Sequence, residues 1–145
     1  MERHGVNGNI GRAFISGFGL KSGAIASSIG HDNHNIIVVG TNPADMAFAV
    51  NQVAEMEGGQ VVVENGKVLA SLALPVFGLL SDLSAEKVAS AKKEMNQAYH
   101  QLGGRMESPF MILSFICLAS IPFHAVTDCG FIDVLSGKVI DPVIG

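Results

Sequence analysis

The stretch SSIGHDNHNIIVVGTNPADM, residues 27–46, decides the fold, because a strand and the start of a helix follow each other directly within it. Ile36 to Val39 form a continuous β-branched run, which predicts a strand buried on both faces. Asn42 is a good N-cap, and Pro43 suits the first helical position. Asp45 adds negative charge to the first turn, where the helix dipole favours it. The stretch therefore predicts a buried strand that leads into an amphipathic helix.

Periodic segments on both sides of this stretch predict the remaining elements. The first helix ends at Gly58, the dipeptide Asn65–Gly66 indicates a hairpin turn, and a second helix runs from Ser84 to Gly103. The expected strands are 13–15, 24–26, 36–39, 60–63, 68–72, 131–134 and 139–140, and the apolar segment 110–121 is expected to be a core strand or a packed connection. We therefore expect the α/β (α+β) class, with a mixed, largely antiparallel sheet packed with two main helices in a single compact domain over residues 1–145.

Composition argues against two kinds of partner. The chain carries nine Lys and Arg residues and a net charge of −4, so it has no basic stripe to neutralise a row of phosphates, and we expect no nucleic-acid partner. The most apolar stretch, Phe110 to Ile121, is well short of the roughly 20 residues that a membrane helix needs. We therefore expect no membrane partner either.

The same composition indicates where the protein works. Cys117 and Cys129 are the only cysteines, lack CxxC spacing, and are expected to be reduced in a cytoplasmic protein. Glu2 and Arg3 disfavour a secretory signal at the start of the chain. Hydrophobic residues make up 48% of the chain and charged residues only 15%, so we expect apolar surface to meet another domain or subunit, and we expect a homo-oligomer.

The polar segment GHDNHN, Gly30 to Asn35, is the main candidate site. Its residues His31, Asp32 and His34 form the densest set of ligand and proton-transfer groups in the chain, and imidazole and carboxylate are acceptable ligands for zinc or iron. Three such ligands and one water would form an open metal site. The alternative is that the two histidines only hydrogen-bond backbone groups and cap the loop, and spacing alone favours it. His31 and His34 are therefore weak metal candidates.

Other candidates have simpler structural interpretations. The segment GFGLKSG, residues 17–23, does not match a phosphate loop, because Leu20 occupies the position of the last required glycine, so we expect a glycine-rich turn. Cys129 has no histidine nearby in sequence and is expected to be structural. His4 and His100 are expected at the surface, and His124 is expected to be half-buried.

Three segments resemble the carboxy-terminal domain of adenine deaminase, an enzyme of the amidohydrolase superfamily. In chain order they are GNIGRAFISGFGLKSGAIASSIGHDNHNIIVVGTNPADMAFAVN, GGQVVVENGKVLASLALPVFGLLSDLSAEKVA and PFMILSFICLASIP. The most specific part is Ser27 to Met46, where the polar run, the strand and the helix start all agree with the family pattern. Met1 is followed directly by ERHG, which resembles mid-chain family sequence, so we expect the chain to be part of a longer protein.

The resemblance implies an enzyme that hydrolyses adenine to hypoxanthine and ammonia. Its metal-bearing barrel, which would hold manganese or iron, precedes this domain in the family and has no counterpart in 145 residues, since such a barrel needs about 250. We therefore assign no catalytic, cofactor-binding or metal-binding residue to this chain and expect it to be inactive alone. His31, Asp32, Asn33 and His34 are expected to lie near the substrate and to complete the active site of the barrel.

Two alternatives belong to different classes of protein. One is a free-standing binding or oligomerisation module whose apolar surface docks another protein. The other is a small independent metal hydrolase built on His31, Asp32 and His34.

Overall fold

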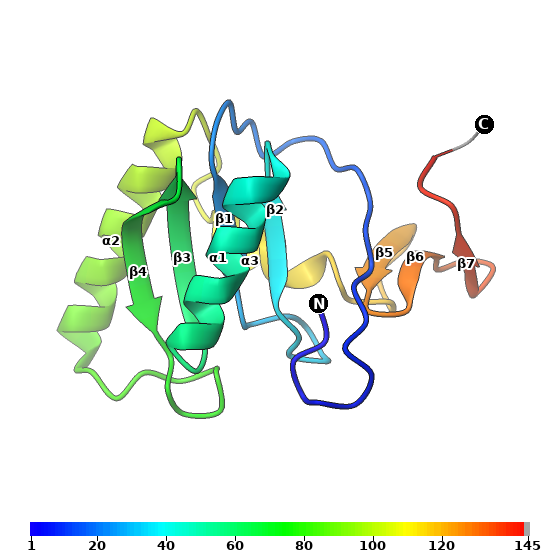
Figure 1. Ribbon diagram of the computed structural model, residues 1–145, viewed down its shortest axis with the longest axis horizontal. Coiled ribbons are helices and arrows are strands. Elements are labelled where there is room, and N and C mark those ends of the chain that lie inside the picture. The colour runs from blue at the N-terminus through cyan, green and yellow to red at the C-terminus, as the bar shows by residue number, and fades with distance from the viewer. Residues whose placement is uncertain (144–145) are drawn as a thin grey trace.

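Four antiparallel strands form the main sheet of the computed structural model, which describes residues 1–143 (Figure 1). Their spatial order is β2-β1-β3-β4. The strands are β1 (Ala24–Ser27), β2 (Ile37–Gly40), β3 (Gly59–Glu64) and β4 (Lys67–Ala73). β3 and β4 form the hairpin predicted from the Asn65–Gly66 turn, and β1 pairs with β2 and β3 on its two edges.

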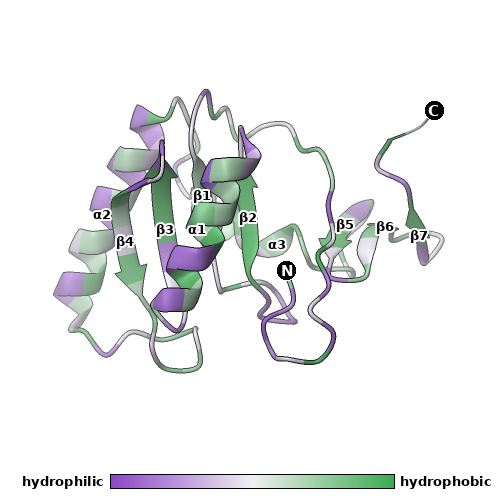
Figure 2. Ribbon diagram, viewed as in Figure 1, coloured by the Kyte–Doolittle hydropathy of each residue, from purple (hydrophilic) through white to green (hydrophobic). Residues whose placement is uncertain are grey.

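Helices cover both faces of this sheet. Helix α1 (Pro43–Glu55) packs on one face, and α2 (Ala85–Gln101) and α3 (Pro109–Phe115) pack on the other. The alternation along the strands follows this division, since Ala24 and Ala26 belong to the apolar cluster under α1 and Ile25 belongs to the cluster under α2 and α3. Figure 2 shows hydrophobic residues along β1, β2 and β3 and hydrophilic residues on the outer surfaces of α1 and α2. The α+β class with two main helices is therefore confirmed.

A second, three-stranded sheet lies beside the first (Figure 1). It consists of β5 (His124–Thr127), β6 (Gly130–Asp133) and β7 (Lys138–Ile140), in that order. β6 and β7 agree with the expected strands 131–134 and 139–140, whereas β5 was not predicted. Within the described residues every strand pair is antiparallel, and the strands divide between two sheets where one mixed sheet was expected.

The prediction that residues 36–39 form a strand buried on both faces is confirmed in part, since Ile36 and Val39 are buried in the apolar clusters on opposite faces of the sheet. β2 is an edge strand, and Ile37 and Val38 are only half-buried, whereas all four residues of β1 are buried. A β-branched run reports that side chains meet apolar neighbours, but it does not report whether a second strand covers the backbone edge. The central positions belong to β1 and β3.

One further expectation is corrected, and another is confirmed in one of its two forms. Residues 13–15 form no strand, because the side chain of Phe14 is 83% exposed and no partner strand lies alongside this segment in the described chain. The apolar segment 110–121 is not a core strand: it begins with helix α3 (Pro109–Phe115), whose buried Phe110 and Leu113 make it a packed connection. Pro109 at the first helical position favours that helix. The expected glycine-rich turn at 17–23 is present, and the hydroxyl of Tyr99 anchors it by donating to the Phe18 carbonyl (2.5 Å).

Asp45 joins the start of α1 to the β3–β4 turn. Its backbone N–H donates to Asn42 Oδ1 (2.8 Å), and its carboxylate accepts from Asn42 Nδ2 (2.9 Å) and from the backbone N–H of Gly66 (2.9 Å). These hydrogen bonds lower the pKa of Asp45, with the Asn42 side chain contributing most. The predicted N-cap is therefore confirmed, and it also fixes the hairpin.

We predict that Asp45→Ala destabilises the protein by about 1 kcal/mol, because it removes half of a reciprocal cap and leaves the Gly66 N–H without its acceptor. The free energy of unfolding from urea titration measures the effect. Asp82→Ala is the matched control, since Asp82 is an exposed aspartate just before α2. Equal stabilities for the two variants would contradict the prediction.

Candidate functional site

The GHDNHN loop, residues 30–35, connects β1 to its antiparallel neighbour β2. Its backbone is held by hydrogen bonds at several points. The N–H of His31 donates to the Ser114 carbonyl of α3 (2.8 Å), and the N–H of His34 donates to the Gly30 carbonyl (2.7 Å). Asn33 Oδ1 accepts from the N–H of Asn35 (2.9 Å), which closes a tight local turn. The loop is therefore an ordered structure.

The N-terminal segment supports this loop from outside. Arg3 Nε donates to the His34 carbonyl (2.5 Å), and Arg3 Nη2 donates to the carbonyl of Phe77 in the loop after β4 (2.8 Å). His4 Nε2 lies 2.9 Å from the Asn33 carbonyl oxygen. Sequence reasoning missed this support, because it used the charged N-terminal residues only as evidence against a secretory signal. The available signal was that Glu2 and Arg3 stand side by side in a chain in which only 15% of residues are charged.

Glu2 holds the N-terminal segment in shape. Its carboxylate accepts hydrogen bonds from the backbone N–H groups of His4, Val6, Asn7 and Gly8. The side chain is only 6% exposed. The hydrogen bond from Gly8 contributes most to lowering the pKa of Glu2, and those from the other three N–H groups act in the same direction. One carboxylate thus closes the turn that presents Arg3 and His4 to the GHDNHN loop.

We predict that Glu2→Gln lowers the melting temperature at neutral pH. The folded-state pKa of Glu2 lies below its unfolded value, so its contribution to stability is present above the unfolded pKa and is lost as the pH falls through the folded pKa. The difference between wild type and variant should therefore shrink on acidification. Thermal unfolding across the acid range measures it, and a difference that is independent of pH would contradict the assignment.

The titratable side chains of the loop make no hydrogen bonds that hold it. Among the hydrogen bonds of residues 1–143, none uses the imidazole of His31 or His34 or the carboxylate of Asp32. Asp32 is exposed, while the His31 ring packs on Phe115 with ring centroids 4.7 Å apart. The interpretation that the histidine side chains cap the loop is therefore not supported, because backbone and asparagine groups do this work.

The same side chains do not form a metal site. Within the described chain, no group of three or more His, Cys, Asp or Glu residues is close enough to hold a metal ion. His31, Asp32 and His34 are neighbours in sequence, but their side chains do not converge. The residues present therefore do not fit the three-ligand site considered from their spacing.

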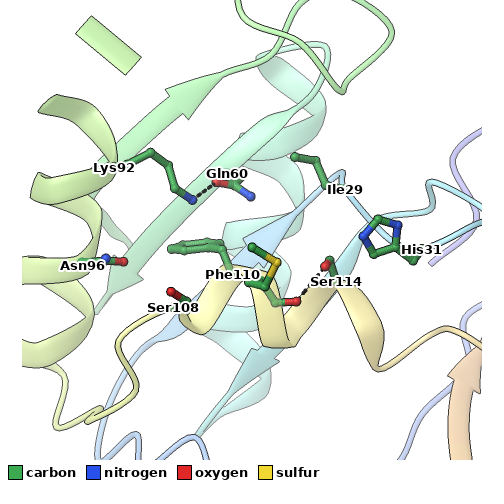
Figure 3. A pocket seen from close by; sticks show the side chains of 9 residues that line it. Ile29, His31, Gln60, Lys92, Asn96, Ser108, Phe110 and Ser114 are labelled. Carbon is green, nitrogen blue, oxygen red and sulfur yellow. Dashed lines mark hydrogen bonds between the residues drawn. The ribbon is translucent and has the colours of Figure 1, made fainter. Parts of the chain in front are cut away.

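His31 also lines a small pocket of about 280 Å³ between α2, α3 and the sheet (Figure 3). Lys92 and Gln60 lie at the opposite side, with Lys92 Nζ donating to Gln60 Oε1 (2.7 Å). The ammonium group also lies 4.7 Å from the centre of the Phe110 ring. Burial lowers the pKa of Lys92. The half-buried position of Lys92 could not be predicted from the helical pattern, because its partners Gln60 and Phe110 are remote in sequence.

The two cysteines and the three remaining histidines occupy the following positions relative to the GHDNHN loop. Cys117 and Cys129 are both free thiols. Cys117 is buried, which raises its pKa, and its Sγ donates to the His31 carbonyl (3.0 Å). His4 and His100 are exposed as expected. His124 is exposed as well, which corrects the expectation of half-burial: in β5 its neighbour Ala125 takes the buried face.

The fold and the site together define an α+β domain that presents an ordered polar loop at its surface. Within residues 1–143, no helix combines the length and apolar character needed to cross a membrane.

Comparison with known proteins gives the family. The family model for the adenine deaminase C-terminal domain matches residues 1–138. The chain is 49% identical over 144 residues to an adenine deaminase of Desulforamulus reducens, an alignment that covers 99% of this chain and 24% of the relative. It is 46% identical over 145 residues to an adenine deaminase of Moorella thermoacetica (100% and 24%) and 52% identical over 134 residues to one of Brucella anthropi (92% and 24%). The chain belongs to the adenine deaminase C-terminal domain family, and it spans about a quarter of the length of these curated relatives.

Proposed function

We propose that this chain works as the C-terminal domain of an adenine deaminase, which hydrolyses adenine to hypoxanthine and ammonia, and that it is inactive alone. The family match over residues 1–138 carries this proposal. The relatives contain about three quarters of their length outside the matched region, which is ample room for a metal-bearing amidohydrolase barrel. The described residues offer no cluster of three metal ligands, so the manganese or iron of the reaction is assigned to that preceding domain.

The GHDNHN loop is the part of this domain that we assign to the active site. Arg3, His4 and the asparagines hold its backbone, so His31, Asp32 and His34 remain available for contacts with another domain or with adenine. An imidazole can donate to or accept from a purine nitrogen, and a carboxylate can accept from an amino group. We propose that these side chains, with Asn33, orient the substrate at the mouth of the barrel.

The exposed apolar residues and the free thiols of this domain indicate its partners and its compartment. Several large apolar residues are more than 60% exposed, namely Val6, Phe14, Phe77, Leu80, Phe123 and Leu135. Contact with the barrel and with a second subunit would cover such residues, and two free thiols suit a reducing compartment. We therefore propose a cytoplasmic homo-oligomeric enzyme.

The test of the family role is a domain replacement. The matched C-terminal quarter of the Desulforamulus reducens adenine deaminase is exchanged for this chain, and adenine consumption is followed by ultraviolet absorbance. We expect the chimera to turn over adenine, while this chain alone and the relative cut before the matched region do not. Adenine turnover by this chain alone, or equal activity of the truncated relative and the chimera, would overturn the proposal.

The role of the loop is tested in the same chimera. His31→Ala and His34→Ala are each expected to lower kcat/KM for adenine by about 10²-fold, the usual scale for lost orientation or proton transfer. The melting temperature should change little for His34→Ala, because its imidazole makes no hydrogen bond within the described domain, whereas His31→Ala also loses the packing of its ring on Phe115. The control is His100→Ala, an exposed histidine on α2.

Unchanged kinetics for both loop variants would overturn the substrate role. A lower melting temperature with unchanged kcat/KM would instead favour a loop that only fastens this domain to the barrel.

A further inference from the structure

The free edge of β2 borders a large apolar groove of about 1390 Å³. β2 and α1 form one wall, with Val38, Met46 and Val50 among the lining residues. The N-terminal arm at residues 10–15 and the small sheet β5-β6-β7 form the other wall (Figure 1). A strand edge with unpaired backbone groups beside an apolar groove is a template for a further strand.

Residue 1 already occupies the start of this edge. The Met1 nitrogen donates to the Ile36 carbonyl (2.8 Å), and the Ile36 N–H donates to the Met1 carbonyl (3.0 Å). Two residues that exchange both hydrogen bonds form the hydrogen-bonded pair of an antiparallel ladder. Met1 also lines the groove. Its pair with Ile36 is thus one rung of a ladder directed along β2.

The backbone of β2 is in phase with this rung. The Thr41 N–H donates to the Gly23 carbonyl (3.0 Å), and the β1–β2 register pairs Ile25 with Val39 and Ser27 with Ile37. Because hydrogen-bonded pairs alternate, the peptide groups of odd-numbered β2 residues face β1. Those of Val38 and Gly40 therefore face the groove, on the same side as the pair between Ile36 and Met1.

We propose that, in the longer proteins of this family, the segment joined to the position of Met1 lies in the groove as a fifth strand, antiparallel to β2. The proposal rests on the proposed function, in which this domain follows the catalytic part of the chain. Two observations identify this segment as the occupant of the groove. The family model describes a C-terminal domain, and about three quarters of each relative lies outside the match. The chain that arrives at residue 1 therefore ends beside this edge.

The register specifies the chemistry of the segment. The second and fourth residues before Met1 lie opposite Val38 and Gly40 and make the hydrogen bonds, while the first and third lie opposite Ile37 and Val39. Opposed residues share a face of the sheet. The second residue therefore faces α1 at Met46 and Val50, and the first and third face the side of the groove lined by Ile116. All of these positions favour apolar, β-branched residues.

The experiment extends this chain at its N-terminus by the eight residues that precede the matched region in the Desulforamulus reducens adenine deaminase. Amide hydrogen exchange is measured by NMR in the extended and unextended chains. We expect the N–H groups of Val38 and Gly40 to exchange about tenfold more slowly in the extended chain, the protection expected from one added hydrogen bond. The N–H groups of Ile37 and Val39 already face β1 and should change little.

Two proline variants of the extension provide the matched control. Proline at the second residue before Met1 removes a ladder donor and should abolish the added protection. Proline at the third residue should keep it, because the N–H lost there points away from β2. Protection that is equal in both variants would overturn the proposed register.

Other outcomes also decide against the proposal. Equal exchange of Val38 and Gly40 in the extended and unextended chains would overturn strand addition. Protection of the unextended chain that rises with protein concentration would assign the edge to a second copy. These failures are separate from those of the proposed function, since the chimera can turn over adenine while Val38 and Gly40 remain unprotected.

Discussion

The structure depends on the complete burial of β1, a strand of only four residues. Its residues lie between α1 on one face and α2 and α3 on the other, and β2 and β3 satisfy both of its backbone edges. Because β1 is fixed on both faces and both edges, it also fixes where the adjoining segments begin. Just beyond it, Ser28 donates to the Gly78 carbonyl (2.5 Å) and accepts from the Gly59 N–H (2.8 Å), which connects the loops at this end of the sheet. The GHDNHN loop begins two residues later.

The backbone of the GHDNHN loop is held by groups other than its own histidine and aspartate side chains. Polar side chains near a core normally satisfy the backbone around them, and this is the interpretation that spacing favoured for His31 and His34. Here, Arg3, His4 and Asn33 supply the hydrogen bonds that the loop backbone needs. The imidazoles of His31 and His34 make no hydrogen bond within the described residues.

Local signals predicted most of the elements of the main sheet, whereas contacts between remote residues determined the site. Asn42, Pro43 and the Asn65–Gly66 turn act on their own neighbours, so the start of α1 and the β3–β4 hairpin were predictable. The GHDNHN loop stood out by polar density alone. The support from Arg3 and the placement of Lys92 against Gln60 cross 31 and 32 residues, and no periodicity reports such pairs. The edge position of β2 was missed for a related reason, since side-chain pattern carries no information on backbone neighbours.

The edge of β2 and the GHDNHN loop are consecutive, and this adjacency connects the two proposals. The loop ends at Asn35, and Ile36 is the residue that pairs with Met1. If the preceding segment adds to β2, a hydrogen-bonded ladder joins the catalytic part of the chain to this domain directly beside the loop. A ladder fixes distance and orientation far better than a flexible linker, because each rung restricts both backbones. Substrate-orienting side chains need such accuracy, since displacement by about 1 Å is enough to cost two orders of magnitude in rate. The apolar groove would then serve to align His31, Asp32 and His34 with an active site that lies in another domain.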